Sequence, residues 1–562
     1  MTPPANALRT IEESPDVGIE MPDCCRLSAR IWRPTDAADN PVPAILEFLP
    51  YRKRDGTTVR DALTHLWFAE RGYAWIRVDM RGNGDSEGLM ENEYTRQELD
   101  DAVATIHWLA QQPWCTGMIG MMGISWGGFN ALQVATLATG GLGDAYKNTV
   151  PLLVEQLTAP VKGIVGPWVH KYPHFAVPEP RIGFLQEALR WWDHWLKGID
   201  TGVDKDPAYR AYLMDGVRPQ RRYNERSGRW IAEAEGATSH LPALTLGLSD
   251  EGLGLDGPLN VRVRSPQTCG MESGDYCAIW LGPDMPGDQR ADDALSACFD
   301  GAPLAENMDI VGAPRIRLRL SADRRQAQIA VRLNHVHPDG ASTRITYGVL
   351  NLTHRDSHAE PTPLTPGAVY DVSLDLDHIA YRVPKGHRLR VAISSAYSPL
   401  IWPSPEHTEL HLTQGDITIP QRPSGGDEYT FPPPESAPAL GQTSLRAPNN
   451  SRRVETDMNS GETHLIIKDD FGLVTNNDHG QIHGGMAHER WTIHPDDPFS
   501  ARGHCKWTQE ISRNGIDLRT ETSCEMWADQ NSFFLRARKD AFEGDKLVST
   551  KRLEDAIPRD QM

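Results

Sequence analysis

A chain of 562 residues is too long for one ordinary hydrophobic core, so it predicts two or three domains. With 39% hydrophobic and 24% charged residues, its composition is typical of a water-soluble globular protein. The formal net charge of −19 argues against nucleic acid or an anionic membrane surface as a partner, and no run of about 18 apolar residues is present to cross a bilayer.

The N-terminal segment and the cysteines bear on the cellular compartment. Met1–Val17 has no apolar stretch and carries acidic residues, so we expect no secretory signal. The eight cysteines match no zinc or redox spacing, and adjacent cysteines such as Cys24 and Cys25 rarely bridge each other. Reduced thiols are therefore expected, which favours a cytoplasmic location.

Residues 24–200 alternate short apolar segments with helical ones, the pattern of a mainly parallel sheet covered by helices. In the last predicted helix, the tryptophans share one face and Gly198 ends the run, which favours core packing over ligand binding. The expected strands are Arg26–Trp32, Pro43–Leu49, Tyr73–Asp79, Met118–Gly123 and Val161–Val165, and the expected helices are Glu98–Gln111, Val150–Leu157 and Arg181–Lys197.

After Asp206 the pattern changes to short alternating strands separated by Gly, Pro, Asp and Asn, which is typical of a β-sandwich or jelly roll. A stretch rich in Pro, Gly and Ser, Pro420–Pro448, is expected to be a linker, with a smaller β-rich unit beyond it. The predicted strands are Leu259–Val263, Ile316–Leu320, Gln328–Leu333, Thr346–Leu352 and Leu389–Ser394 before the linker, and Glu462–Ile467, Ala487–Ile493, Cys505–Ile511 and Ile516–Met526 after it.

The segment Gly123–Gly128 follows an apolar strand and contains the pattern Gly-x-Ser-x-Gly. This pattern predicts a nucleophile elbow, in which Ser125 occupies a sharp strand-to-helix turn and points its hydroxyl into a site. Glycines flank the serine because larger side chains would collide where the chain doubles back. The segment therefore indicates a serine hydrolase, which also needs a base, an acid and an oxyanion hole.

In a fold with this elbow the nucleophile, acid and histidine follow one another along the chain. Between Ser125 and His170, the first suitable histidine, the only acids are Asp144 and Glu155. Asp144 ends a glycine-rich segment suited to a strand end, whereas Glu155 fits a solvated helix face better. His170 follows a predicted strand at the same sheet edge, and His174 is the weaker alternative. We expect Ser125 to attack, His170 to take its proton and Asp144 to orient the imidazole.

Four segments of the chain resemble the CocE/NonD hydrolases, the family of cocaine esterase and X-Pro dipeptidyl-peptidase: Leu49–Lys53, Asp79–Gly88, the Ser125 elbow and Gly166–His170. The resemblance implies a fold of the α/β plus all-β class. It consists of an α/β-hydrolase domain over residues 1–205, a jelly-roll β-sandwich over 206–435 and a β-rich C-terminal unit over 450–562.

The resemblance also implies an oxyanion hole with two donors, the backbone N–H of Trp126 and the hydroxyl of Tyr51. It implies neither a metal nor an organic cofactor. The glycines of Arg81–Gly88 miss the spacing of a dinucleotide-binding loop, so we expect a structural turn there. The expected partner is a small ester, amide or short peptide substrate, with no nucleic acid and no membrane; a homo-oligomer is left open.

The chain departs from the family pattern between the nucleophile and the acid, where only 18 residues separate Ser125 from Asp144. Most of a helical cap and one sheet strand are predicted to be missing near residues 135–137. Leu142, in place of an aromatic residue before the acid, and Cys24-Cys25, in place of a hairpin Asp-Gly, are smaller departures. Because the cap helps to enclose the acyl group in this family, its loss predicts a more open, less selective site.

Two functions follow from these observations. The leading hypothesis is a serine hydrolase that cleaves esters or amides, X-Pro peptides included, through an acyl-enzyme. The alternative, prompted by the short interval, is a degenerate non-catalytic member whose β domains serve binding or assembly. His479, His483 and His488 lie close in sequence, but their segment has no helix to align two imidazoles, so surface histidines are favoured over a metal site.

Overall fold

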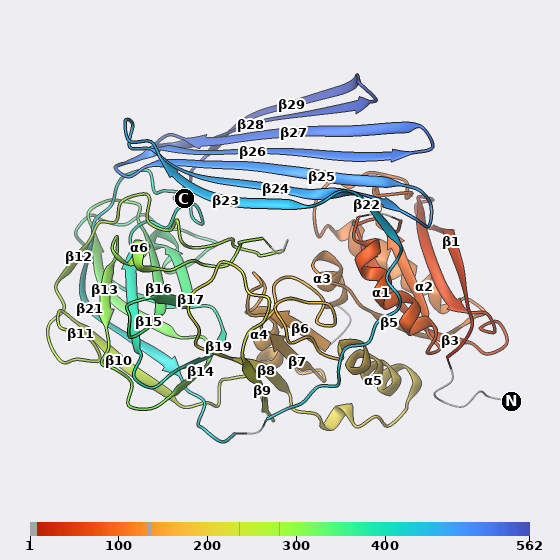
Figure 1. Ribbon diagram of the computed structural model, residues 1–562, viewed down its shortest axis with the longest axis horizontal. Coiled ribbons are helices and arrows are strands. Elements are labelled where there is room, and N and C mark those ends of the chain that lie inside the picture. The colour runs from red at the N-terminus through yellow and green to blue at the C-terminus, as the bar shows by residue number, and fades with distance from the viewer. Residues whose placement is uncertain (1–7, 55, 133–136, 235, 280–281, 427) are drawn as a thin grey trace.

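The computed structural model describes residues 8–54, 56–132, 137–234, 236–279, 282–426 and 428–562. Figure 1 shows an α/β region at one end and an all-β region beside it, with one long C-terminal sheet extending over both. No described helix is long and apolar enough to span a bilayer.

The first sheet of the α/β region has five strands in the order β1-β2-β4-β3-β5. β3 pairs in parallel with β4 and β5, and both β3 and β4 are buried along their whole length. Such continuous burial is expected of parallel strands covered on both faces. The strands are β1 (Ile11–Glu20), β2 (Arg26–Pro34), β3 (Val42–Leu49), β4 (Ala74–Asp79) and β5 (Cys115–Met121), and the helices are α1 (Thr58–Ala69), α2 (Arg96–Ala110), α3 (Trp126–Leu132), α4 (Thr149–Gln156) and α5 (Phe184–Lys197).

A second sheet continues the α/β region into the all-β region, with the order β14-β19-β8-β7-β6 and β9 paired with β8. It therefore crosses the predicted domain boundary at residue 205. β6, β7 and β8 are parallel to one another. The strands are β6 (Leu137–Gly141), β7 (Lys162–Gly166), β8 (Tyr209–Asp215), β9 (Gly228–Glu233), β14 (Met308–Gly312) and β19 (Ile379–Val383).

The parallel strands are interrupted between β5 and β6. Among the described residues, β5 pairs only with β3 and β6 only with β7. The loss predicted near 135–137 falls partly on residues 133–136, which lie outside the described residues. Next to this interruption α5 packs closely on β5. The Trp192 ring of α5 lies so near Gly120 of β5 that a Cβ on this glycine would come within 2.7 Å of it.

The jelly roll consists of two facing antiparallel sheets, one in the order β11-β10-β21-β15-β18 with β12 on β21, the other in the order β13-β20-β16-β17. Short helices η1 (Val203–Lys205), α6 (Arg290–Asp293) and η2 (Leu352–His354) accompany them. The strands are β10 (Ala243–Ser249), β11 (Gly252–Leu253), β12 (Val261–Val263), β13 (Ala297–Asp300), β15 (Arg315–Ala322), β16 (Gln328–Val336), β17 (Ser342–Asn351), β18 (Val369–Asp375), β20 (Arg388–Ser394) and β21 (Leu410–Pro420).

The C-terminal residues form an eight-stranded antiparallel sheet that lies across the other two regions (Figure 1). Its outermost strand, β29, is exposed along its whole length. The strands are β22 (Gln442–Arg446), β23 (Asn449–Thr456), β24 (Thr463–Asn476), β25 (Ile482–His494), β26 (Asp497–Arg513), β27 (Ile516–Ala528), β28 (Ser532–Glu543) and β29 (Lys546–Pro558).

The predicted fold class is confirmed, and every predicted strand and helix overlaps an observed one. The linker prediction for Pro420–Pro448 is wrong at its C-terminal end, where β22 pairs with β24. β22 is short and mostly exposed, so it has no apolar alternation to reveal it. β1 was also not predicted, because its buried positions are too few to produce a clear period of two.

Candidate active site

Ser125 occupies the turn between β5 and α3, with a left-handed φ of +58°. This conformation is uncommon for a residue with a side chain, and it is the strain expected of a nucleophile elbow. Gly123 must lack a side chain, because a Cβ there would lie 2.4 Å from the carbonyl carbon of Gly127. The turn therefore depends on Gly123, whereas a Cβ on Gly127 would make only ordinary contact with Leu49 at 3.5 Å.

Asp144 follows β6 at the same edge of the parallel strands. The glycine-rich segment before it lies against the chain that follows β7, and a Cβ on Gly141 would come within 2.1 Å of the Trp168 carbonyl oxygen. The Gly143 N–H donates to that oxygen at 2.9 Å. Asp144 Oδ1 in turn accepts the Tyr146 N–H at 3.1 Å, which holds the carboxylate in place.

His170 lies beyond β7 and is hydrogen-bonded to Asp144, with 2.8 Å between Nδ1 and Oδ2. Because a carboxylate only accepts, Nδ1 carries the proton and the lone pair is on Nε2. Both Ser125 and His170 line one cavity. Among the described residues no direct hydrogen bond joins the two. In unliganded enzymes the hydrogen bonds between catalytic groups are often long and shorten only when substrate binds.

The jelly-roll region contacts this pair through a loop that the sequence analysis did not identify. The His170 N–H donates to the Ala278 carbonyl at 3.0 Å. The Cys277 thiol lies 3.9 Å from Asp144 Oδ1, as a weak donor. Burial raises the pKa of Cys277 to about 11, so the thiol keeps its proton at neutral pH. No sequence signal near Cys277 points to this contact, because it depends on how the two regions pack.

Tyr51 and Trp126, the two predicted oxyanion donors, lie next to each other. The Trp126 N–H donates to the Tyr51 hydroxyl oxygen at 3.3 Å. The loop that carries Tyr51 is fixed by Lys53, which is fully buried; its N–H donates to Asp79 at 2.6 Å and its ammonium to Asp85 at 2.6 Å. The segment Arg81–Gly88 is a structural turn that supplies Asp85 to this anchor.

The cavity at Ser125 has a volume of about 150 Å³ and is mainly apolar. It extends from the elbow to α4 and α5, on the side where the strands are interrupted. Its apolar lining comes from β5, α4 and α5 and includes Met121, Met122, Val150, Leu153, Phe184, Ala188 and Trp192.

Glu155 and His174, the weaker candidates for the acid and the base, make contacts outside the candidate triad. Glu155 is exposed on its helix, as expected, and its carboxylate also accepts backbone N–H groups of the loop 237–239 of the all-β region. His174 is buried against Phe184 and bonds to Thr64 at 3.5 Å, outside the cavity lining. Burial lowers the pKa of His174 to about 3, so it stays neutral.

Three groups of described residues bring metal-ligating atoms within 4.8 Å of one another. One is the pair of Asp144 and His170 with Cys277, in which the carboxylate and imidazole already bond each other. A second, on the surface, contains His194 and two aspartates, and the third consists of jelly-roll histidines. The sequence neighbours His479, His483 and His488 are in none of these groups.

Comparison with known proteins agrees with this organisation. Residues 23–139 match the X-Pro dipeptidyl-peptidase (S15 family) model, and residues 201–431 match the X-Pro dipeptidyl-peptidase C-terminal non-catalytic domain. The chain is 22% identical over 531 residues to cocaine esterase from Rhodococcus sp. (strain MB1 Bresler), covering 68% of this chain and 91% of that protein.

Two solved structures share the fold. A CocE/NonD family hydrolase from Staphylococcus aureus superposes with a TM-score of 0.56 at 13% identity, over 73% of this chain and 94% of that one. An alpha-amino acid ester hydrolase superposes with a TM-score of 0.56 at 16% identity, over 75% of this chain and 98% of that one.

The parallel sheet and the match to the S15 family model define the class: this is an α/β-hydrolase that works as a serine hydrolase. Within that class the chain belongs to the CocE/NonD family, since both its α/β region and its jelly roll match the domains of those hydrolases.

Proposed function

We propose that this serine hydrolase cleaves carboxylic esters through an acyl-enzyme, with Ser125 as nucleophile, His170 as general base and Asp144 as the residue that orients the imidazole. The observation that carries the proposal is the 2.8 Å bond between His170 Nδ1 and Asp144 Oδ2 beside the cavity that Ser125 also lines. It leaves Nε2 as the one nitrogen able to take the serine proton.

In the first half-reaction, Ser125 Oγ attacks the ester carbonyl carbon while His170 Nε2 accepts its proton. The carbonyl oxygen becomes an oxyanion, which accepts from the Trp126 N–H and the Tyr51 hydroxyl. Collapse breaks the C–O bond, and His170 returns the proton to the leaving alcohol. Water then repeats the sequence on the acyl-enzyme, releasing the carboxylic acid and free Ser125.

The cavity supports a compact apolar acyl group. A cavity of about 150 Å³ is comparable to one that holds a benzene ring. The lining from α4 and α5 offers contact area but few polar groups to orient a polar acyl chain. We therefore propose aromatic or short branched acyl groups as the preferred substrates.

The charges at the cavity favour esters over X-Pro peptides. A peptidase that removes an N-terminal dipeptide has to hold a free ammonium group. Of the described residues that line the cavity, the only carboxylate is Asp144, which His170 already occupies. Lys171 also lines it, and burial, with the nearby Arg60, lowers the pKa of its ammonium to about 8. A partly cationic cavity repels an incoming ammonium.

We further propose a cytoplasmic location and a small-molecule ester as the partner. All eight cysteines are free thiols, and Cys505 lies directly opposite Cys524 on adjacent strands without bridging to it. Thiols so placed persist best in a reducing compartment. Homo-oligomerisation stays a hypothesis, which sedimentation velocity of the purified chain tests directly.

The test combines labelling with turnover. A fluorophosphonate probe should label the wild type and not Ser125→Ala, while p-nitrophenyl benzoate and butyrate should be hydrolysed faster than alanyl-prolyl p-nitroanilide. His174→Gln, outside the cavity lining, serves as the matched histidine control for His170→Gln. Wild-type turnover no higher than that of Ser125→Ala would reject the proposal and favour the non-catalytic alternative.

A further inference from the structure

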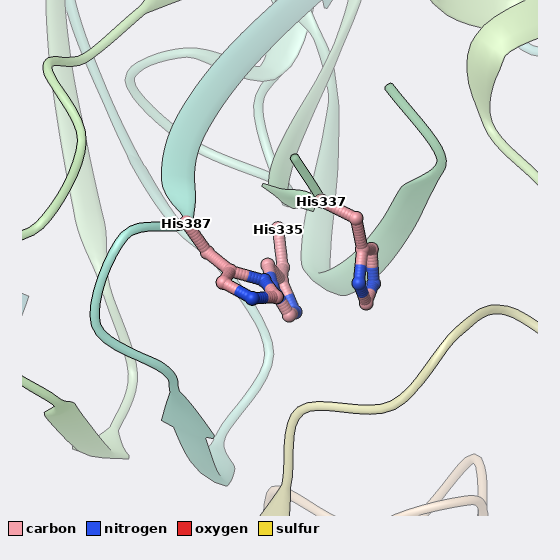
Figure 2. Close-up of side chains that lie close together, drawn as sticks. All are labelled: His335, His337 and His387. Atoms are coloured by element: carbon pink, nitrogen blue, oxygen red, sulfur yellow. The ribbon is translucent and has the colours of Figure 1, made fainter. Parts of the chain in front are cut away.

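Three histidines of the jelly roll lie together on adjacent strands, far from any role in the hydrolase mechanism. His335 and His337 are two residues apart at the end of β16, so their side chains leave the same face. β16 pairs with β20 in a register that sets His335 against Leu389 and Val336 against Arg388. Continued by one pair, this register sets His387 opposite His337. Figure 2 shows the three side chains gathered on these strands.

The ring nitrogens are close enough for shared ligation. One nitrogen from each ring lies within 4.8 Å of the other two, and His335 Nε2 lies 2.5 Å from His387 Nδ1. The centroids of the His335 and His337 rings are 4.0 Å apart. Nitrogens around a tetrahedral zinc ion are about 3.3 Å apart, for Zn–N bonds of about 2.0–2.1 Å. Small ring rotations would therefore reach ligand geometry.

Hydroxyl groups already determine which nitrogen His337 presents. Its Nε2 bonds to Thr343 Oγ1 at 3.0 Å, and that hydroxyl donates its own hydrogen to the Val217 carbonyl at 3.0 Å. Thr343 can then only accept from His337, so Nε2 carries the proton and the Nδ1 lone pair is free. This is how outer hydrogen bonds orient a metal-ligating histidine.

His335 is held in a similar way. Its Nδ1 bonds to the Tyr381 hydroxyl at 2.9 Å, and its Nε2 bonds to His387 Nδ1, so a metal ion would replace the bond between these two rings. Gly216 packs against the ring so closely that a Cβ there would lie 2.8 Å from His335 Cε1. The ring is fully buried and cannot turn away from its neighbours without displacing backbone.

Burial disfavours the charged form of all three imidazoles. Burial, together with the neighbouring imidazoles, lowers the pKa of His335 to about 3, and burial also lowers the pKa values of His337 and His387. The Arg218 guanidinium near the cluster would repel a metal ion, but it is paired with the Asp339 carboxylate, which offsets its charge.

We propose that His335, His337 and His387 bind one divalent transition-metal ion of the zinc type, with water in the fourth position. Neutral imidazole suits zinc, nickel and copper, and three histidines with an open position form a known zinc donor set. The ion would tie the end of β16 to the start of β20 and so stabilise the jelly roll, without taking part in ester cleavage.

The test uses the full chain, stripped with a chelator, dialysed and titrated with Zn²⁺ or Co²⁺ alone. We expect about one Zn²⁺ per chain, a higher Tm with Zn²⁺, and the visible absorption of low-symmetry four-coordinate Co²⁺. His337→Gln and His387→Gln should each lose zinc affinity by more than 100-fold. The matched control His411→Gln, on β21 of the same jelly roll, should bind like the wild type.

Two measurements distinguish the loss of a zinc ligand from the loss of the fold. Circular dichroism and fluorophosphonate labelling of Ser125 should be unchanged in His387→Gln, whose side chain is only partly buried. Thr343→Val should lower affinity by about 10-fold or more while leaving all three histidines in place. Absence of zinc binding by the wild type, or wild-type zinc affinity in both histidine variants, would overturn the proposal.

Discussion

The α/β region and the jelly roll both use buried histidines, but they prepare the imidazole for different chemistry. In the α/β region a carboxylate bonds Nδ1 of His170, which lines the same cavity as Ser125. In the jelly roll, hydroxyls bond His335 and His337, and the remaining nitrogens face each other. A carboxylate stabilises the imidazolium that forms during proton transfer, whereas a neutral hydroxyl does not.

The difference teaches that the partner of the second ring nitrogen decides the role of a buried histidine. An imidazole paired with Asp144 can gain a proton and keep it briefly. An imidazole paired with Thr343 or Tyr381 stays neutral and can only donate its lone pair. If this is correct, changes at the α/β site should alter ester hydrolysis and leave zinc affinity unchanged. Changes at the jelly-roll histidines should alter zinc affinity and leave ester hydrolysis unchanged.

The largest effect should follow from replacing the carboxylate. Asp144→Asn keeps the shape of the side chain but can donate to Nδ1, which favours the wrong tautomer of His170. We expect kcat for p-nitrophenyl benzoate to fall by about 10⁴-fold, as for similar changes in other serine hydrolases. The zinc affinity of the same variant should not change. A loss of zinc affinity together with the loss of kcat would contradict the independence of the two sites.

Removal of one oxyanion donor should have the next largest effect. Tyr51→Phe deletes the hydroxyl that lies 3.3 Å from the Trp126 nitrogen. We expect kcat to decrease by about 10²–10³-fold with little change in KM, because the hydroxyl acts in the transition state. Tyr146→Phe, at the same cavity, is the control. Equal rates for Tyr51→Phe and the wild type would remove Tyr51 from the oxyanion hole.

The sequence was sufficient to predict the regions and the order of the candidate triad, because these depend on local patterns. An elbow is a short motif, and Asp144 and His170 follow strands at one sheet edge. The support from Cys277 could not be predicted, since it comes from a loop more than a hundred residues away. The cavity at the strand interruption was equally hidden, because it depends on how α4 and α5 fill that side.

The histidine clusters also show that contacts between distant segments cannot be predicted from local sequence patterns. His479, His483 and His488 attracted attention because they are close in sequence, yet they form no ligand group in the described structure. His335 and His337, two positions apart just beyond the predicted strand Gln328–Leu333, were not singled out from the sequence. Their third partner, His387, is brought in by antiparallel pairing, which a sequence pattern alone does not specify.

A smaller effect is expected from a change in the jelly roll, which should lower zinc affinity and leave ester hydrolysis unchanged. Tyr381→Phe removes the hydroxyl that holds His335 Nδ1 at 2.9 Å. We expect zinc affinity to decrease by about 10-fold, within the range for outer hydrogen bonds to metal ligands. Ester hydrolysis should keep its wild-type kcat and KM. A change in kcat would mean that the jelly-roll site affects catalysis.

The smallest effect concerns Glu155, whose carboxylate makes one of the contacts between the α/β region and the all-β region. Burial alone would raise the pKa of Glu155, but the N–H groups of Thr238 and Ser239 and the Ser239 hydroxyl lower it to about 2. A lowered pKa means that the carboxylate stabilises the folded state above its usual pKa near 4.5, and that this contribution is lost as pH falls from there towards 2. Glu155→Gln should lower Tm by about 1–2 °C at pH 7, because this half-exposed contact is worth little.

The same difference in Tm should shrink as the pH falls from 4.5 towards 2, because the carboxylate of the unfolded wild-type chain takes up its proton first and that of the folded protein only near pH 2. Thermal unfolding of both proteins at pH 7 and pH 3 measures it, with Glu251→Gln as an acidic control in the all-β region. Zinc affinity and kcat should be those of the wild type, since Glu155 touches neither site. A Tm difference that is constant with pH would show that the side chain acts by packing and not by its charge.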